Sequence, residues 1–357
     1  MKVFHQLSEL EGFGPTIVSI GNFDGVHAGH VQVVDQIVKL AKERGLKSLV
    51  LTFEPHPVRF LRPDATLKLL TPTPEKLRLL DELGLDAALV LSFTQELCQM
   101  SPREFTRNIL ESGVQAREVH EGYNFRFGHK AAGDVNTLTA LGREMEFEVV
   151  IYPEMKLRRE SVSSSHIRSL LMEGRVQRAR HLLGRPFSIA GTASEGRGYG
   201  SKYTVPTINL SPYGELVPKH GVYITRTGVG AELFNSVTNI GNRPTFGVDS
   251  FAIESHLLDF HPLALHADTV IEICFLQRLR DEVKFPSVEE LRAQIGKDIH
   301  RTRRFFRAIQ VEGRLCGPRC ALSIQQRTFC LSAAKSDSQC SDCYATQAGS
   351  GSRWATC

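Results

Sequence analysis

Apolar and polar positions follow two different rhythms along the first half of the chain. Short apolar runs rich in Val and Ile are typical of strands, and longer stretches with helical spacing separate them. We expect strands at 16–21, 48–53, 87–92, 118–121 and 147–152. We expect helices at 30–44, 75–83, 102–112, 133–145, 164–173 and 175–183. Alternation of this kind predicts a parallel sheet covered by helices.

The pattern changes after Pro186. Short β-branched or aromatic runs at 221–225 and 268–273 stand between turn-forming clusters at 211–214 and 241–244. This pattern predicts a compact antiparallel barrel or sandwich, closed by a terminal helix at about 287–308. From about residue 309 the chain has no sustained period and is rich in Ser, Gln, Gly and Cys, so we expect disorder there.

The length and charge of the chain narrow the class of protein. A chain of 357 residues has room for roughly two domains. Its 41% hydrophobic and 23% charged residues are typical of a soluble protein, and a net charge of +4 suits small anionic substrates better than nucleic acid. The first ten residues lack the apolar core of a signal peptide, and no apolar run is long enough to span a membrane. We therefore expect a cytoplasmic protein.

The cysteines are unevenly distributed. Before residue 309 only Cys98 and Cys274 occur, which suits a reducing compartment. The other six crowd the last 42 residues, where the spacings Cys316-x3-Cys320 and Cys340-x2-Cys343 leave a zinc site open as an alternative. The absence of histidine there favours a disordered extension, or a sequence unrelated to the preceding domains, such as one from a shifted reading frame.

A glycine-rich turn at 21–29 joins the first expected strand to the first expected helix and carries His27 and His30. Such a turn offers backbone N–H groups and a helix N-terminus to a phosphate. The two imidazoles add donors that can stabilise charge in a transition state. Taken alone, the same two histidines could equally serve capping or packing.

Three further segments fall where the same site would be completed. The proline-locked loop 52–57 ends the second strand, the aromatic segment 122–128 follows the fourth, and Ser163 to Arg168 begins a helix. Ligands bind open parallel sheets at the carboxyl ends of the strands. Hydroxyls, free N–H groups and an arginine at that edge suit a polyphosphate.

The run Gly-Asn-Phe-Asp-Gly-Val-His-Ala-Gly-His at 21–30, with these segments in this order, resembles the bacterial bifunctional riboflavin kinase/FAD synthetase (FMN adenylyltransferase) family. The resemblance implies a Rossmann-like nucleotidylyltransferase domain in which His27 and His30 contact the ATP phosphates and stabilise charge at the α-phosphorus. It also implies nucleotide-binding roles for Asn22, Phe23, Asp24, Asn124, Ser164, Ser165 and Arg168. Ser165 stands where the family usually has threonine, and Glu121 stands where a small apolar residue is expected.

Residues 186–308 resemble the riboflavin kinase module of the same family. The resemblance rests on Val-Pro-Thr-Ile-Asn-Leu at 205–210 and on segments 239–247, 254–260 and 279–285. It implies an antiparallel β-barrel in which Thr207 and Asn209 position Mg²⁺ on ATP and Glu254 is the general base. Gly196 to Lys202 is not a P-loop, because it lacks the Gly-Lys-Ser/Thr ending. Ser201, Thr204 and Val205 depart from the family's usual flap residues.

These patterns predict an α/β plus β protein with an adenylyltransferase domain at 1–185, a riboflavin kinase domain at 186–308 and a cysteine-rich tail at 309–357. The resemblance implies that riboflavin is phosphorylated to FMN and that FMN is then adenylylated to FAD, with ATP and Mg²⁺. Two alternatives stay open: a nucleotidylyltransferase for another phosphate ester with a degenerate kinase domain, and a non-catalytic flavin-binding protein. We expect small-molecule partners, neither nucleic acid nor membrane, and a monomer or weak homo-oligomer.

Overall fold

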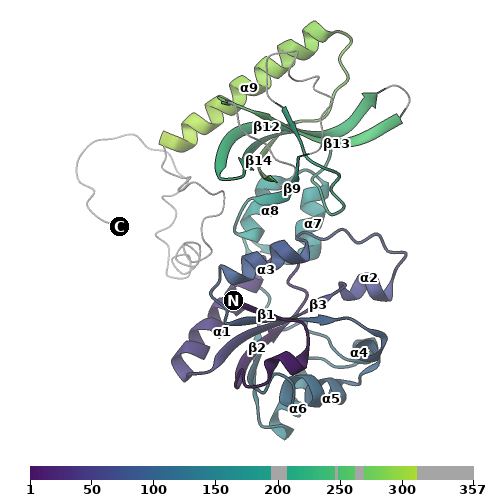
Figure 1. Cartoon of the computed structure of the whole chain (residues 1–357), viewed down its shortest axis with the longest axis vertical. Coiled ribbons are helices and arrows are strands. Elements are labelled where there is room, and N and C mark those ends of the chain that lie inside the picture. The colour runs from purple at the N-terminus through teal and green to yellow at the C-terminus, as the bar shows by residue number, and fades with distance from the viewer. Residues whose placement is uncertain (194–206, 246–247, 262–268, 312–357) are drawn as a thin grey trace, which may run out of the picture.

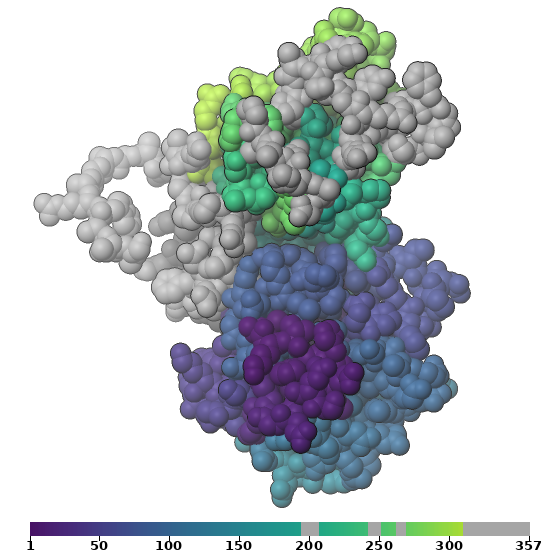
Figure 2. Space-filling model, viewed as in Figure 1, coloured from purple at the N-terminus to yellow at the C-terminus, as the bar shows by residue number. Residues whose placement is uncertain are grey.

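The structure is a computed structural model that describes residues 1–193, 207–245, 248–261 and 269–311. A parallel sheet with its helices forms the N-terminal body, and a curled antiparallel sheet forms the C-terminal body (Figure 1). Figure 2 shows the purple-to-blue and teal-to-yellow bodies in contact. The flap residues Ser201, Thr204 and Val205 and the six cysteines after residue 309 lie outside the described residues.

The N-terminal sheet has six strands in the order β1-β4-β3-β2-β5-β6, and every neighbouring pair is parallel. The strands are β1 (Lys2–Phe4), β2 (Thr16–Ile20), β3 (Lys47–Glu54), β4 (Ala87–Ser92), β5 (Ala116–Gly122) and β6 (Glu148–Tyr152). The five strands expected from the sequence are confirmed, and β1 adds a short edge strand beside β4. The chain progresses from β2 in one direction to β3 and β4, and in the other to β5 and β6.

Helices cover both faces of this sheet, because neighbouring residues of a strand point to opposite sides. Ile17 packs with Val34 and Leu80 under α1 and α3, whereas Val18 packs with Leu110 and Leu138 on the opposite face. The helices and helical turns are η1 (Leu7–Leu10), α1 (Ala28–Arg44), α2 (Pro57–Leu61), α3 (Thr73–Asp81), α4 (Gln95–Gln99), α5 (Pro102–Phe105), η2 (Thr106–Glu111), η3 (His129–Ala131) and α6 (Val135–Glu144). The short helices α2 and α4 were not expected.

Two helices join the bodies. α7 (Ser164–Met172) and α8 (Val176–Leu183) follow a two-stranded hairpin of β7 (Lys156–Leu157) and β8 (Glu160–Ser161). Their apolar side chains, including Ile167 and Leu182, share one core with Phe187 and Ile273 of the antiparallel sheet. α8 ends at Gly184, which has φ 73° and thus the left-handed conformation that favours glycine. α7 and α8 are therefore the packed joint between the two sheets.

The C-terminal sheet has six antiparallel strands in the order β10-β13-β12-β11-β14-β9. They are β9 (Phe187–Thr192), β10 (Thr207–Asn209), β11 (Gly221–Val229), β12 (Glu232–Thr245), β13 (Val248–Leu257) and β14 (Val270–Arg280), and α9 (Val288–Val311) follows them. The sheet curls so far that its two edge strands approach each other. This is shown by the bridge between Ala193, after β9, and Leu210, after β10.

One expected turn is wrong. The cluster at 241–244 is part of β12, which continues to Thr245 and pairs with β13 throughout. The pairing of β12 with β11 ends at Ile240 opposite Gly221. Beyond that point no other described strand pairs with this side of β12, and an unpaired side tolerates proline because no ladder hydrogen bond is lost. The glycine and proline therefore mark the edge of a long strand and not its end.

None of the described helices combines the length and the apolar character needed to cross a membrane.

Candidate active sites

A cavity of about 640 Å³ lies at the carboxyl ends of β2, β3, β5 and β6. All nine site residues that the sequence placed in the N-terminal body line it: Asn22, Phe23, Asp24, His27, His30, Asn124, Ser164, Ser165 and Arg168. The cavity lies where the chain order reverses around β2, which is the usual ligand position in open parallel sheets.

The glycine-rich turn between β2 and α1 is shaped by backbone that few side chains tolerate. Phe23, Gly25 and Val26 have φ values of 48°, 84° and 36°. A Cβ atom on Gly25 would lie 2.7 Å from Cδ1 of Leu70, so a side chain at this position would require Leu70 to move. The turn delivers the chain into α1 with its first N–H groups at the cavity.

His27 and His30 form a stacked pair at the start of α1. Their ring centroids are 3.6 Å apart and the planes differ by 14°. Nδ1 of His27 accepts a hydrogen bond from the backbone N–H of His30 at 3.3 Å and so caps the helix. His27 therefore caps the helix and also lines the cavity, and the His30 imidazole lines the same cavity.

Both imidazoles are neutral near pH 7. Burial, and then the nearby Arg185 guanidinium, lower the pKa of His27 from 6.5 to about 4. Burial also lowers the pKa of His30 far below its usual value, with further contributions from His27, Arg185 and Lys76. A neutral imidazole still donates one N–H, and because Nδ1 of His27 accepts a bond, the proton of that ring belongs on Nε2.

Asp24 holds the other wall of the cavity together. Its Oδ1 accepts the backbone N–H groups of Leu70 and Thr71 at 2.9 and 3.0 Å, and its Oδ2 accepts Nη2 of Arg168 at 2.7 Å. The Ser164 hydroxyl donates to the Asp24 carbonyl at 2.9 Å. The turn, the segment before α3 and the start of α7 are thereby fixed to one another. Two helix N-termini, those of α1 and α7, face one cavity.

The kinase residues expected from the sequence also meet. In the register of the antiparallel sheet, Asn209 of β10 lies opposite Glu254 of β13, and Glu254 lies opposite Asn239 of β12. Thr207 lies two residues before Asn209 and therefore on the same face. Directly opposite residues in an antiparallel pair have Cβ atoms about 5 Å apart. The structure brings these oxygen-bearing side chains together across three adjacent strands.

Comparison with known proteins covers both bodies. A family model described as FAD synthetase matches residues 11–166, and one described as riboflavin kinase matches residues 183–306. The bifunctional riboflavin kinase/FMN adenylyltransferase of Listeria monocytogenes is 34% identical over 297 residues, covering 82% of this chain and 93% of the relative. The enzyme of the same description from Escherichia coli K12 is 32% identical over 303 residues, covering 85% and 96%.

The chain belongs to the bifunctional riboflavin kinase/FMN adenylyltransferase family.

A solved structure from Streptococcus pneumoniae, described as a macrolide-efflux protein, has the same fold over both bodies. Its TM-score is 0.76 at 25% sequence identity, and the match covers 84% of this chain and 98% of that one. The assignment to the riboflavin kinase/FMN adenylyltransferase family rests on the two family models and the relatives, and this structure adds the shared architecture.

Lys76 is a further residue of the adenylyltransferase half that the sequence patterns did not single out. Its side chain is 5% exposed, and Nζ donates to Oγ1 of Thr52 at 3.0 Å and to the carbonyl of Asn22 at 3.3 Å. Burial lowers the pKa of this ammonium group. A signal was present in the sequence, because Lys76 occupies the apolar position of its helix in register with Leu79, Leu80 and Leu83.

Arg185 was likewise missed. It is 8% exposed and lies after α8, where Nη1 donates to the carbonyl of Val26 in the glycine-rich turn at 3.0 Å. Burial lowers the pKa of this guanidinium to about 10. Arg185 therefore links the end of α8, which is part of the joint between the two sheets, to the turn that precedes His27.

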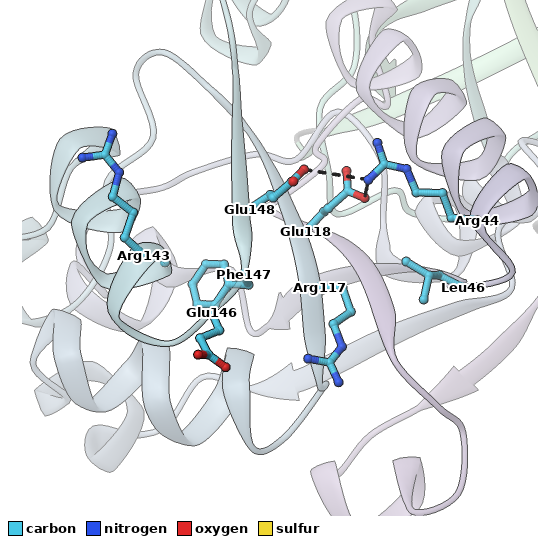
Figure 3. Close-up of a pocket in the computed structure, with 9 residues that line it drawn as sticks. Arg44, Leu46, Arg117, Glu118, Arg143, Glu146, Phe147 and Glu148 are labelled. Carbon is cyan, nitrogen blue, oxygen red and sulfur yellow. Dashed lines mark hydrogen bonds and ion pairs between the residues drawn. The ribbon is translucent and has the colours of Figure 1, made fainter.

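A second cavity, of about 410 Å³, lies at the amino ends of β5 and β6. None of the expected site residues lines it. Figure 3 shows that Arg44 is turned toward Glu118 and Glu148, with which it forms ion pairs. The Arg117 and Arg143 side chains point away from each other in the same view. The arginines therefore do not converge on one point in this cavity.

Proposed function

We propose that this chain makes both flavin cofactors. The C-terminal domain transfers the γ-phosphoryl group of ATP to riboflavin and gives FMN. The N-terminal domain transfers the adenylyl group of a second ATP to FMN and gives FAD and pyrophosphate. The observation that carries the proposal is the single cavity that collects all nine nucleotide-site residues, in a chain whose relatives carry this pair of activities.

We place the adenylyltransferase domain at 1–185, as a Rossmann-like nucleotidylyltransferase, and the kinase domain at 186–308, as an antiparallel β-barrel. The reversal of strand order at β2 supports the first assignment, and the bridge between Ala193 and Leu210 supports the second. α9 continues to Val311, three residues beyond the expected end of the kinase domain, and residues 309–357 have no catalytic role in this proposal.

Adenylyl transfer needs positioning more than proton transfer. The FMN phosphate is already ionised, so it attacks the α-phosphorus of ATP without a general base. The neutral imidazoles of His27 and His30 donate N–H groups to phosphate oxygens as charge builds at that phosphorus. The N-terminus of α7, with Ser164, Ser165 and Arg168, holds the β,γ-phosphates that leave as pyrophosphate. Asn22, Phe23 and Asn124 line the remaining walls.

Phosphorylation of riboflavin does need a base, because the ribityl 5′-hydroxyl is a poor nucleophile. Glu254 takes that proton as the γ-phosphorus is attacked. The Thr207 hydroxyl and the Asn209 amide oxygen are hard ligands on one face of β10, and such a pair fits Mg²⁺ shared with ATP phosphates. When bound, Mg²⁺ neutralises phosphate charge, and these two residues would hold it.

The experiment is a chromatographic time course. Purified protein is incubated with riboflavin, ATP and Mg²⁺, and the flavins are separated. The proposal expects FMN first and FAD after it. FAD formation from supplied FMN, but none from riboflavin, would reject the kinase assignment. Riboflavin that stays unchanged, with no FAD formed from supplied FMN either, would leave a flavin-binding protein without catalysis.

A further inference from the structure

Glu121 is a buried carboxyl group in the wall of the adenylyltransferase cavity. Its side chain lies near the end of β5, is 4% exposed and lines the cavity. The ladder between β2 and β5 ends with Val18 opposite Val119, although both strands continue. In the gap that follows, the backbone N–H of Ile20 donates to Oε1 of Glu121 at 2.5 Å. The side chain therefore supplies the acceptor that the diverging strand no longer offers.

Within the part of the chain that the structure describes, no compensating charge acts on this carboxyl group. β2 has no ionisable side chain, and Glu148 and Tyr152 of β6 lie on the opposite face, as do Glu118 and His120 of β5 itself. The cavity is also lined by His27, His30, His56, Asp24, Glu154 and Arg168. None of these groups contributes to the pKa of Glu121, which burial raises well above its usual value and the Ile20 N–H lowers only in part.

A neutral carboxylic acid has one O–H donor and keeps acceptor capacity on its oxygens. Oε1 already accepts the Ile20 N–H, so the acidic proton belongs on Oε2. Because Glu121 lines the cavity, a ligand bound there can offer the acceptor for this donor and replace its hydrogen bond to water. Both substrates of the proposed reaction carry a flat heteroaromatic ring with carbonyl or ring-nitrogen acceptors, and Tyr123 and Phe125 offer aromatic faces in the same cavity.

We propose that Glu121 is a neutral carboxylic acid that donates a hydrogen bond from Oε2 to a carbonyl or ring-nitrogen acceptor of the ring bound in this cavity. This inference rests on the proposed adenylyltransferase function. It makes Glu121 a specificity-determining residue, since a site built around a donor discriminates strongly against a ring that lacks the matching acceptor. The ring is either the adenine of ATP or the isoalloxazine of FMN.

The test compares Glu121→Gln with Glu121→Val in FAD synthesis from FMN and ATP. Glutamine keeps a donor and an acceptor but cannot ionise, whereas valine has neither. At pH 7.5, Glu121→Gln should keep both KM values within about threefold of the unmodified protein, and Glu121→Val should raise one of them about tenfold to a hundredfold. A raised KM for ATP identifies adenine, and a raised KM for FMN identifies the flavin. Unchanged values of both in Glu121→Val would overturn the proposal.

The pH profile separates this role from a structural one. The affected KM should rise with pH in the unmodified protein, as the donor is lost on ionisation, and should stay flat in Glu121→Gln. Equal profiles in the two proteins would contradict the proposal. Riboflavin phosphorylation by the same samples reports whether the kinase domain of each variant is intact, and the KM of the substrate that does not contact Glu121 reports the same for the N-terminal domain.

Infrared difference spectra give a readout without turnover. The spectrum of the unmodified protein minus that of Glu121→Gln at pH 7 should contain the band of a protonated carboxyl group. That band should shift on addition of either FMN or a non-hydrolysable ATP analogue. Absence of the band, or a band that neither ligand shifts, would overturn the inference. Failure of the unmodified protein to make FAD would instead reject the proposed function.

Discussion

Asp24 and Arg168 are 144 residues apart in the sequence and form an ion pair of 2.7 Å between Oδ2 and Nη2. The sequence motifs indicated that both belong to a nucleotide site, but they did not indicate that the two bind each other. The carboxylate also accepts two backbone N–H groups from 70–71. Arg168 therefore reaches the cavity from a fixed position, held by the same turn that carries the histidines.

Substitution Asp24→Ala should destabilise the N-terminal domain. It removes the acceptor of two backbone N–H groups and leaves a partly buried guanidinium without its partner. We expect the free energy of unfolding to fall by about 3–5 kcal/mol, measured by urea denaturation. Glu144→Ala is the matched control, because it breaks the exposed ion pair with Arg103 and should leave the denaturation midpoint unchanged. Equal midpoints for Asp24→Ala and Glu144→Ala would contradict this stabilising role of Asp24.

Acid should weaken the folded state through His27. The pKa of His27 is about 4 in the folded chain, and its ordinary value is 6.5. Between pH 4 and 6.5 the unfolded chain therefore binds a proton at His27 that the folded chain does not bind. The free energy of unfolding should then fall by about 1.4 kcal/mol for each pH unit between 6.5 and about 4, and this contribution should level off below that. His27→Gln should make this slope shallower, whereas His5→Gln, at an exposed position, should leave it as it is. The opposite order of slopes would reject the buried neutral imidazole.

Lys76→Met should impair FAD synthesis and spare the kinase. The ammonium group holds the Asn22 carbonyl and the end of β3, so its loss lets the glycine-rich turn shift. A misplacement of this kind lowers kcat/KM by up to about a hundredfold. Steady-state rates with FMN and ATP measure it, and Lys39→Met, which removes a 66% exposed lysine, is the control. A normal rate in Lys76→Met would show that the turn keeps its shape without the lysine.

Two glycines with positive φ separate strain from steric contact. Gly25 and Gly45 have φ values of 84° and 67°, but a Cβ would meet Leu70 at 2.7 Å only at Gly25 and finds open space at Gly45. Gly45→Ala should cost about 1 kcal/mol of stability through backbone strain alone. Gly25→Ala should cost more and should also reduce FAD formation, because the turn must open. Thermal unfolding and the FAD assay on both variants test this difference.

The elements that local pattern determines were predictable, and those set by distant contacts were not. Thr16–Ile20 is buried throughout and Ala87–Ser92 is buried except at its last residue, and both appear as mostly apolar runs, so both strands were expected. β1 has only three residues and is ordered by pairing with β4. β12 can continue through Pro244 because its pairing with β11 ends at Ile240. The end of that pairing cannot be read from the residues of β12 alone.

The same division holds for the candidate sites. His27, His30 and Arg168 lie in short motifs whose residue types and order along the chain together are informative. Lys76 and Arg185 donate hydrogen bonds to backbone carbonyls of a turn that is remote from them in sequence. No local motif predicts such a contact. Glu121 could be noticed as unusual from the sequence, but its bond to Ile20 depends on the divergence of two strands.

The central claim is that two separate active sites work in sequence on one chain. It is tested most directly with His27→Ala and Glu254→Ala, assayed alone and mixed, with riboflavin and ATP. His27→Ala should accumulate FMN with FAD formation reduced by at least about a hundredfold, and Glu254→Ala should make FAD only when FMN is supplied. The mixture should convert riboflavin to FAD, since released FMN passes from one variant to the other. Loss of both activities in either folded variant would contradict the division of labour.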